Sequence, residues 1–251
     1  MGWTVVGVHC AAREDRLGLV HGELHADARL EVVRATLGTA GESPAHTIAS
    51  WLGSAEQHLV AVDAPLGWPA QLGRHLVAHR AGDPLDATEG LFHRLTDDFV
   101  HSATRRRPPP VAAHAVAHTT RAALAMLREV RALPGAPPLP LAWTQGEDCG
   151  VVEVYPSATL AARGVPSSGF RGNTQAARVR RAEILESITE EFDMDIRRDL
   201  LTENPDIFDA LVAMLAGADF IRRQCQEPPD RDVAQREGWI WVRLYGQGRL
   251  L

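Results

Sequence analysis

The chain has no lysine, so all 26 of its basic residues are arginine. Its 32 acidic residues give a formal net charge of -6 at pH 7. A field of that sign does not attract polyanions to the molecule as a whole. The composition therefore argues against strong, nonspecific binding of nucleic acid. The exclusive use of arginine, beside abundant Ala, Gly and Pro, indicates a composition bias of the genome.

Cysteine is also scarce, since the chain has only Cys10, Cys149 and Cys225. An odd and widely spaced set predicts neither a disulfide framework nor a cysteine-based zinc site. No apolar run approaches the roughly 20 residues that a membrane span needs. The first residues lack the basic start of a signal peptide. We therefore expect a cytoplasmic protein with no membrane segment.

Two common phosphate-binding loops are missing, because neither GxxxxGKS/T nor GxGxxG occurs. What remains is an ordinary composition for a globular protein, with 45% hydrophobic and 23% charged residues. A length of 251 residues is enough to bury a full core. We predict a single α/β domain over 1–251, with a helical insertion over 71–140.

The first quarter of the chain has the pattern of strands joined by short turns. Trp3–Cys10, Arg16–Leu24 and Arg29–Thr36 are short, apolar segments and predict a three-strand meander. Ser43 and Pro44 then suit the start of a helix that returns the chain to a further, parallel strand. This order predicts a ribonuclease-H-like mixed sheet, a meander followed by parallel strands, flanked by helices.

Two buried strands end in an acid that is soon followed by proline. Asp63 closes the apolar run before Pro65, and Glu153 lies near the end of the run before Pro156. Proline cannot donate to a ladder, so both strands stop there. In open α/β folds the carboxyl ends of the strands carry the chemistry. Asp63 also suits the start of a turn before Pro65, which would give it no chemical role.

A strongly apolar segment near the end of the chain predicts a helix that carries two more carboxylates. Asn204 suits its N-cap and Pro205 its first turn. Asp206 and Asp209 share one side with small residues, which lets the backbone approach its neighbours closely. Both acids also suit the positive end of the helix dipole. That alternative serves best for Asp206, whereas apolar neighbours favour a buried role for Asp209.

The topology predicts that these four carboxylates come together. Crowded carboxylates need protons or a cation to offset their repulsion. Oxygen ligands suit Mg²⁺ or Mn²⁺, and we expect Asp63, Glu153, Asp206 and Asp209 as metal ligands. Two such ions about 3.5–4 Å apart can activate water for phosphodiester hydrolysis. The sequence thus suggests a metal-dependent nuclease acting on nucleic acid or on a small phosphodiester.

Arginine is concentrated in two places. Arg105–Arg107 are consecutive, and a second group is spread over residues 163–181. Either group can be a local anion-binding patch, or simply the solvated face of a loop or helix.

Motifs along nearly the whole chain resemble the DUF429 family of predicted ribonuclease-H-like nucleases. They are VVGVH at the amino terminus, AVDAPLGWP, RLTDDFVH, VEVYPSA, DIFDALVAMLAG and a final EGWI. The resemblance implies that fold, with Asp63, Glu153 and Asp209 at acidic motif positions and Asp206 at a further one. Family membership does not by itself establish an activity.

His9 departs from the pattern, because the first strand of such folds normally carries an Asp that often bridges both metals. We consider His9 a variant metal ligand or general base, since a neutral imidazole suits Mn²⁺ or Zn²⁺. Glu14 or Asp15 is an alternative source of the missing carboxylate. The competing hypothesis is a catalytically degenerate domain that binds a protein or nucleic acid. An ion pair between His9 and Asp63 would favour that hypothesis.

Overall fold

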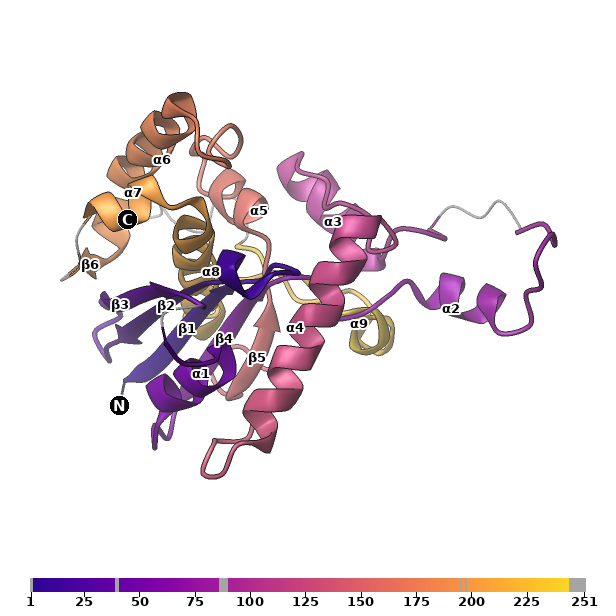
Figure 1. Ribbon diagram of the computed structural model, residues 1–251, viewed down its shortest axis with the longest axis horizontal. Coiled ribbons are helices and arrows are strands. Elements are labelled where there is room, and N and C mark those ends of the chain that lie inside the picture. Colours follow the sequence, from indigo (N-terminus) through magenta and orange to yellow (C-terminus); the bar gives the residue numbers. More distant parts are fainter. Residues whose placement is uncertain (1, 39–40, 86–89, 195, 197, 244–251) are drawn as a thin grey trace.

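The computed structural model describes residues 2–38, 41–85, 90–194, 196 and 198–243, and within them six strands form one mixed sheet (Figure 1). The strands are β1 (Trp3–His9), β2 (Gly18–Leu24), β3 (Leu30–Leu37), β4 (His58–Asp63), β5 (Gly150–Glu153) and β6 (Asp193–Met194). Their order across the sheet is β5-β4-β1-β2-β3-β6. The first three are antiparallel, while β4 and β5 run parallel to β1. The predicted meander and parallel strands are confirmed, in an arrangement consistent with a ribonuclease-H-like fold.

Helices cover both faces of this sheet. They are α1 (Pro44–Leu52), α2 (Ala70–Leu76), α3 (Leu95–Thr104), α4 (His114–Ala132), α5 (Pro156–Ala161), α6 (Gln175–Ile188), α7 (Arg198–Glu203), α8 (Pro205–Ile221) and α9 (Arg231–Glu237), with short 3-10 turns at Glu14–Arg16 and Thr189–Glu191. None of the helices in the described ranges is both long and apolar enough to cross a membrane. All three cysteines are free.

Strand alternation divides the core into two layers. On one face Val5 and Ala61 pack with α8. On the other face Val6 and Val60 pack with α1 and α4. Successive side chains of a strand point to opposite faces, so the central strands β1 and β4 are largely apolar on both sides. In Figure 1, α8 lies above the sheet and α1 lies below it.

Local sequence explains where the key helices begin. The Asn204 side chain caps α8 by accepting hydrogen bonds from the backbone N–H groups of Asp206 and Ile207. α3 begins at Leu95 because Arg94 is its N-cap and donates its backbone N–H to the Asp97 carboxylate.

The segment 71–140 contains most of α2, all of α3 and all of α4. Within it, α4 packs Ala123, Leu127 and Val130 against the sheet-side cluster of Val60 and Val62. α2 lies well away from the sheet in Figure 1. A single domain with an insertion at these boundaries stays a prediction, although α4 clearly belongs to the core.

Glycines let α8 lie unusually close to the sheet. A Cβ added to Gly7 on β1 would collide with the backbone carbonyl of Ala210, and one added to Gly18 on β2 would collide with that of Asp206. Every residue of α8 is buried. The first turn of α8, which carries Asp206, therefore lies against the end of β1, because Gly18 pairs with His9, and Asp209 follows in the next turn.

Candidate metal site

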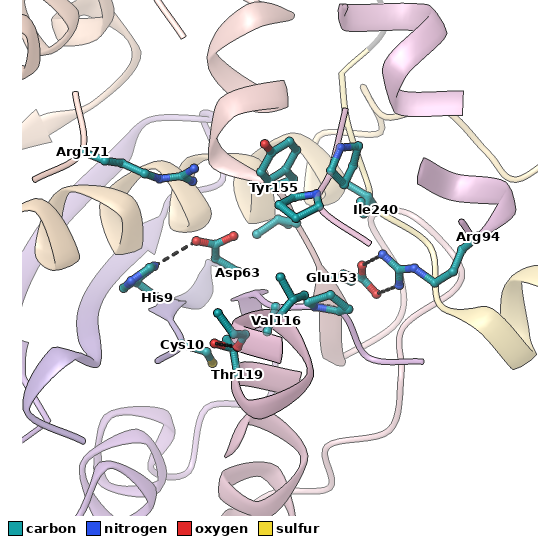
Figure 2. Close-up of a pocket in the computed structure, with 16 residues that line it drawn as sticks. His9, Cys10, Asp63, Arg94, Val116, Thr119, Glu153, Tyr155, Arg171 and Ile240 are labelled. Carbon is teal, nitrogen blue, oxygen red and sulfur yellow. Dashed lines mark hydrogen bonds and ion pairs between the residues drawn. The ribbon is translucent and has the colours of Figure 1, made fainter. Parts of the chain in front are cut away.

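The site begins with two residues at the carboxyl ends of neighbouring strands. His9 is the last residue of β1 and Asp63 the last of β4, and the parallel register places them side by side. Paired residues of adjacent strands project from the same face of a sheet. His9 Nδ1 lies 2.9 Å from Asp63 Oδ2, as the dashed line in Figure 2 marks. The register of β1 against β4 thus places these two side chains within hydrogen-bond distance.

α8 brings its carboxylates to the same place. Asp209 Oδ2 is 3.8 Å from His9 Nδ1, and Asp206 Oδ1 is 3.7 Å from His9 Nε2. One ligand atom each from His9, Asp63 and Asp209 lies within 4.8 Å of the others. We call these three residues the metal cluster, because their donor atoms are close enough to share one ion.

Asp209 is the most buried member of the metal cluster. Burial raises the pKa of its carboxyl, and the charges of Arg171 and His9 oppose that rise only in part. Arg171 donates from Nε to Asp209 Oδ2 at 3.1 Å. Asp209 Oδ1 is buried and has no hydrogen-bond partner among the residues that the structure describes. A buried acceptor without a partner is costly, so this oxygen is suited to receive a cation.

The charge of His9 is set by the carboxylates around it. Burial alone would lower its pKa, but the hydrogen bond to Asp63 and the nearby charges of Asp63, Asp209 and Asp206 outweigh burial and raise it. Without a metal these surroundings favour the imidazolium form. A cation among the same carboxylates would favour neutral imidazole, the form that ligates.

Asp206 is held differently. Arg16 donates two hydrogen bonds to its carboxylate, from Nε at 2.6 Å and from Nη2 at 2.9 Å. The Asp206 carboxylate therefore lies at the border of the metal cluster and is already paired with Arg16. Asp15 does not replace the missing first-strand acid in this arrangement, because its carboxylate pairs with Arg13 in an exposed turn.

Glu153 is not brought to the metal cluster. It pairs in register with Val62, one residue before Asp63, so the two acids project from opposite faces of the sheet. Arg94 binds it with two hydrogen bonds, of 2.7 and 3.0 Å, which Figure 2 shows apart from His9 and Asp63. Arg94 also binds Asp97 at 2.9 Å. We call Arg94, Asp97 and Glu153 the structural cluster.

A cavity of about 200 Å³ opens beside both clusters. Its polar lining includes His9, Asp63 and Arg171. Apolar side chains such as Val116 of α4 and Ile240 form other parts of the wall. Tyr155, which follows β5, lies on the same side of Asp63 as Arg171 (Figure 2). Neither Tyr155 nor Arg94 was singled out from the sequence, though both lie within the motifs that carry the family resemblance.

Comparison with protein families agrees with the resemblance. A family model described as a protein of unknown function (DUF429) matches residues 2–234 of the 251. The chain belongs to the DUF429 family. Comparison with curated proteins and with solved structures finds no match. For this DUF429 protein, function must be argued from the site itself.

Proposed function

We propose that this DUF429 protein is a divalent-metal-dependent phosphodiesterase of the nuclease type. The observation that carries the proposal is the convergence of the donor atoms of His9, Asp63 and Asp209 within 4.8 Å at the edge of a cavity. The carboxyl ends of parallel strands are the usual place for ligand sites in open α/β sheets.

The donor set fits a small divalent cation. Two carboxylates supply hard oxygen ligands, and within the described part of the chain no donor competes for Oδ1 of Asp209. The imidazole of His9 adds a nitrogen ligand, which favours Mn²⁺ over Mg²⁺. When bound, such a metal lowers the pKa of a water and polarises a phosphoryl oxygen.

The protein's own residues would hold and orient the substrate. Arg171 lies between the metal cluster and Tyr155, with its guanidinium carbon 5.9 Å from the Tyr155 ring centroid. A guanidinium is well suited to bind a phosphate oxygen. Asp63 orients the His9 ring through Nδ1. The apolar cavity wall limits the access of bulk water to these groups.

The test is calorimetric titration of metal-free protein with Mn²⁺ and with Mg²⁺. We expect saturable binding by the wild type, strong loss in Asp63→Asn, and no change in Asp232→Asn, an exposed Asp on α9. Hydrolysis of bis(4-nitrophenyl) phosphate should follow the same order. Absence of binding by the wild type at millimolar metal would refute the proposal.

A second candidate function is supported by the charge balance of the site. His9 pairs with Asp63, Arg171 with Asp209 and Arg16 with Asp206, so three carboxylates face three basic groups without any metal. This pairing supports the alternative of a catalytically degenerate ribonuclease-H-like binding module, in which basic side chains neutralise the carboxylates. Nucleic-acid or protein binding without metal uptake and without hydrolysis would favour this candidate.

A further inference from the structure

A second hollow continues from the cavity beside the metal cluster. Its volume is about 370 Å³. It shares Tyr155 and Arg171 with the cavity, and the Arg105–Arg107 run on its rim leads directly into Pro108 and Pro109 of the cavity wall. We call it the arginine groove. Its lining residues are Arg105, Arg106, Arg107, Tyr155, Ser157, Ser167, Ser168, Gly169, Phe170 and Arg171.

The arginine groove is basic although the protein is acidic. Arg105 and Arg107 are exposed, and Arg106 donates from Nε to the Ser167 hydroxyl at 2.8 Å, which fixes one guanidinium at the wall. Arg171 is paired with the buried Asp209, whereas Arg107 donates at 3.1 Å to Asp98, whose side chain is 58% exposed. Exposed ion pairs are weak, so Arg107 remains available to another anion.

The size of the cavity indicates that a ligand extends into the arginine groove. A volume of about 200 Å³ lies below the roughly 300–1,000 Å³ of pockets that enclose a whole small ligand. A substrate reaching the metal cluster would therefore project past Tyr155 and Arg171. The next surface it meets carries guanidinium groups and serine hydroxyls, which bind phosphate oxygens.

We propose that the arginine groove binds the sugar–phosphate backbone of single-stranded nucleic acid and leads it to the metal cluster. This inference rests on the proposed phosphodiesterase function. A single strand fits because one unpaired nucleotide can enter a narrow cavity, whereas a duplex cannot. The half-buried ring of Tyr155 offers a face on which a base stacks.

The test is binding of fluorescent 12-nucleotide single strands, DNA and RNA, measured by anisotropy in EDTA. The double variant Arg105→Gln/Arg107→Gln should bind at least about tenfold more weakly than the wild type, as expected for the loss of charge-assisted phosphate contacts. The slope of log affinity against log salt should fall by about 1.4, since each phosphate contact on a single strand contributes about 0.7.

A matched control separates the arginine groove from general charge. Arg34→Gln/Arg128→Gln removes the same charge from exposed positions on β3 and α4 that do not line the arginine groove. We expect wild-type affinity for this control. Equal weakening of both double variants, no single-strand binding by the wild type at 50 mM salt, or tighter binding of a duplex or of an oligoglutamate peptide would each overturn the proposal.

Binding in EDTA keeps this inference separate from the phosphodiesterase proposal. If Arg105→Gln/Arg107→Gln binds strands like the wild type while bis(4-nitrophenyl) phosphate is hydrolysed, the arginine groove fails and the phosphodiesterase stands. If single strands bind through the arginine groove but neither the strands nor bis(4-nitrophenyl) phosphate is hydrolysed, the phosphodiesterase proposal fails and the arginine-groove proposal stands.

Discussion

The metal cluster and the structural cluster lie at the carboxyl ends of adjacent parallel strands, yet their acids are treated in opposite ways. In the structural cluster, Glu153 receives two hydrogen bonds from Arg94 and one from the backbone N–H of Leu66 at 2.9 Å. In the metal cluster, Asp209 has a buried oxygen to which none of the described residues donates a hydrogen bond. A buried carboxylate at this edge of the sheet is therefore no guide to function until its partners are known.

The difference follows from what faces each acid. Burial raises the pKa of Glu153, and the charge of Arg94 opposes that rise. Arg94 itself is 1% exposed, so its pair with Glu153 is isolated from water and from ions. The metal cluster is more open, with the His9 side chain 19% exposed. The structural cluster connects β5, α3 and the residues before α2. The metal cluster can exchange ligands with solvent.

The largest effect is expected from breaking the structural cluster. Arg94→Met keeps an unbranched side chain but leaves Glu153 and Asp97 buried without their cation. Breaking a buried pair in this way costs about 3–5 kcal/mol. Urea unfolding should show that loss, while Arg128→Met at an exposed position on α4 should change stability by less than about 0.5 kcal/mol. An equally small change in Arg94→Met would mean that the structural cluster does not stabilise the fold.

Two further variants, one in each cluster, test whether metal binding and metal-free stability depend on different clusters. Asp209→Asn should leave metal-free stability nearly unchanged, because the side chain of its ion-pair partner Arg171 is 47% exposed and water can solvate it when the charge of Asp209 is removed. It should abolish the added stability of about 2.7 kcal/mol that a ligand at 100 times its Kd gives to the native state. Thermal unfolding with and without Mn²⁺ measures both quantities.

Glu153→Gln should behave in the opposite way. It should lower metal-free stability, because Arg94 then loses one of its two anionic partners. It should keep the Mn²⁺-dependent gain, because Glu153 projects from the other face of the sheet. Loss of that gain in Glu153→Gln would show that the two clusters form one site.

Most of the metal cluster was predictable from sequence, and the structural cluster was not. Apolar runs ending before Pro65 marked the strand end at Asp63, and Asn204 and Pro205 marked the start of the helix that carries Asp209. Glu153 was wrongly expected to join them because sequence does not give the register of β5 against β4, and one residue decides the face. Its partner Arg94 lies 59 residues away, with no local signal linking the two.

The smallest effect tests how closely α8 must approach the sheet. Gly18→Ala places a methyl group against the backbone at Asp206. The contact is relieved only if α8 or β2 moves. Overpacking of this kind costs typically about 1–3 kcal/mol.

Since Asp209 lies one turn further along α8, its distance from His9 should change and Mn²⁺ affinity should fall, while the structural cluster, on the far side of β4, is left intact. Gly73→Ala on α2 is the matched control, because among the described residues no atom outside its own stretch of α2 lies within 4 Å of the added methyl group. Calorimetry of both variants with Mn²⁺ separates the two glycines. If Gly18→Ala binds Mn²⁺ as tightly as Gly73→Ala does, the close contact of α8 with β2 serves the core alone and the metal cluster tolerates movement of the helix.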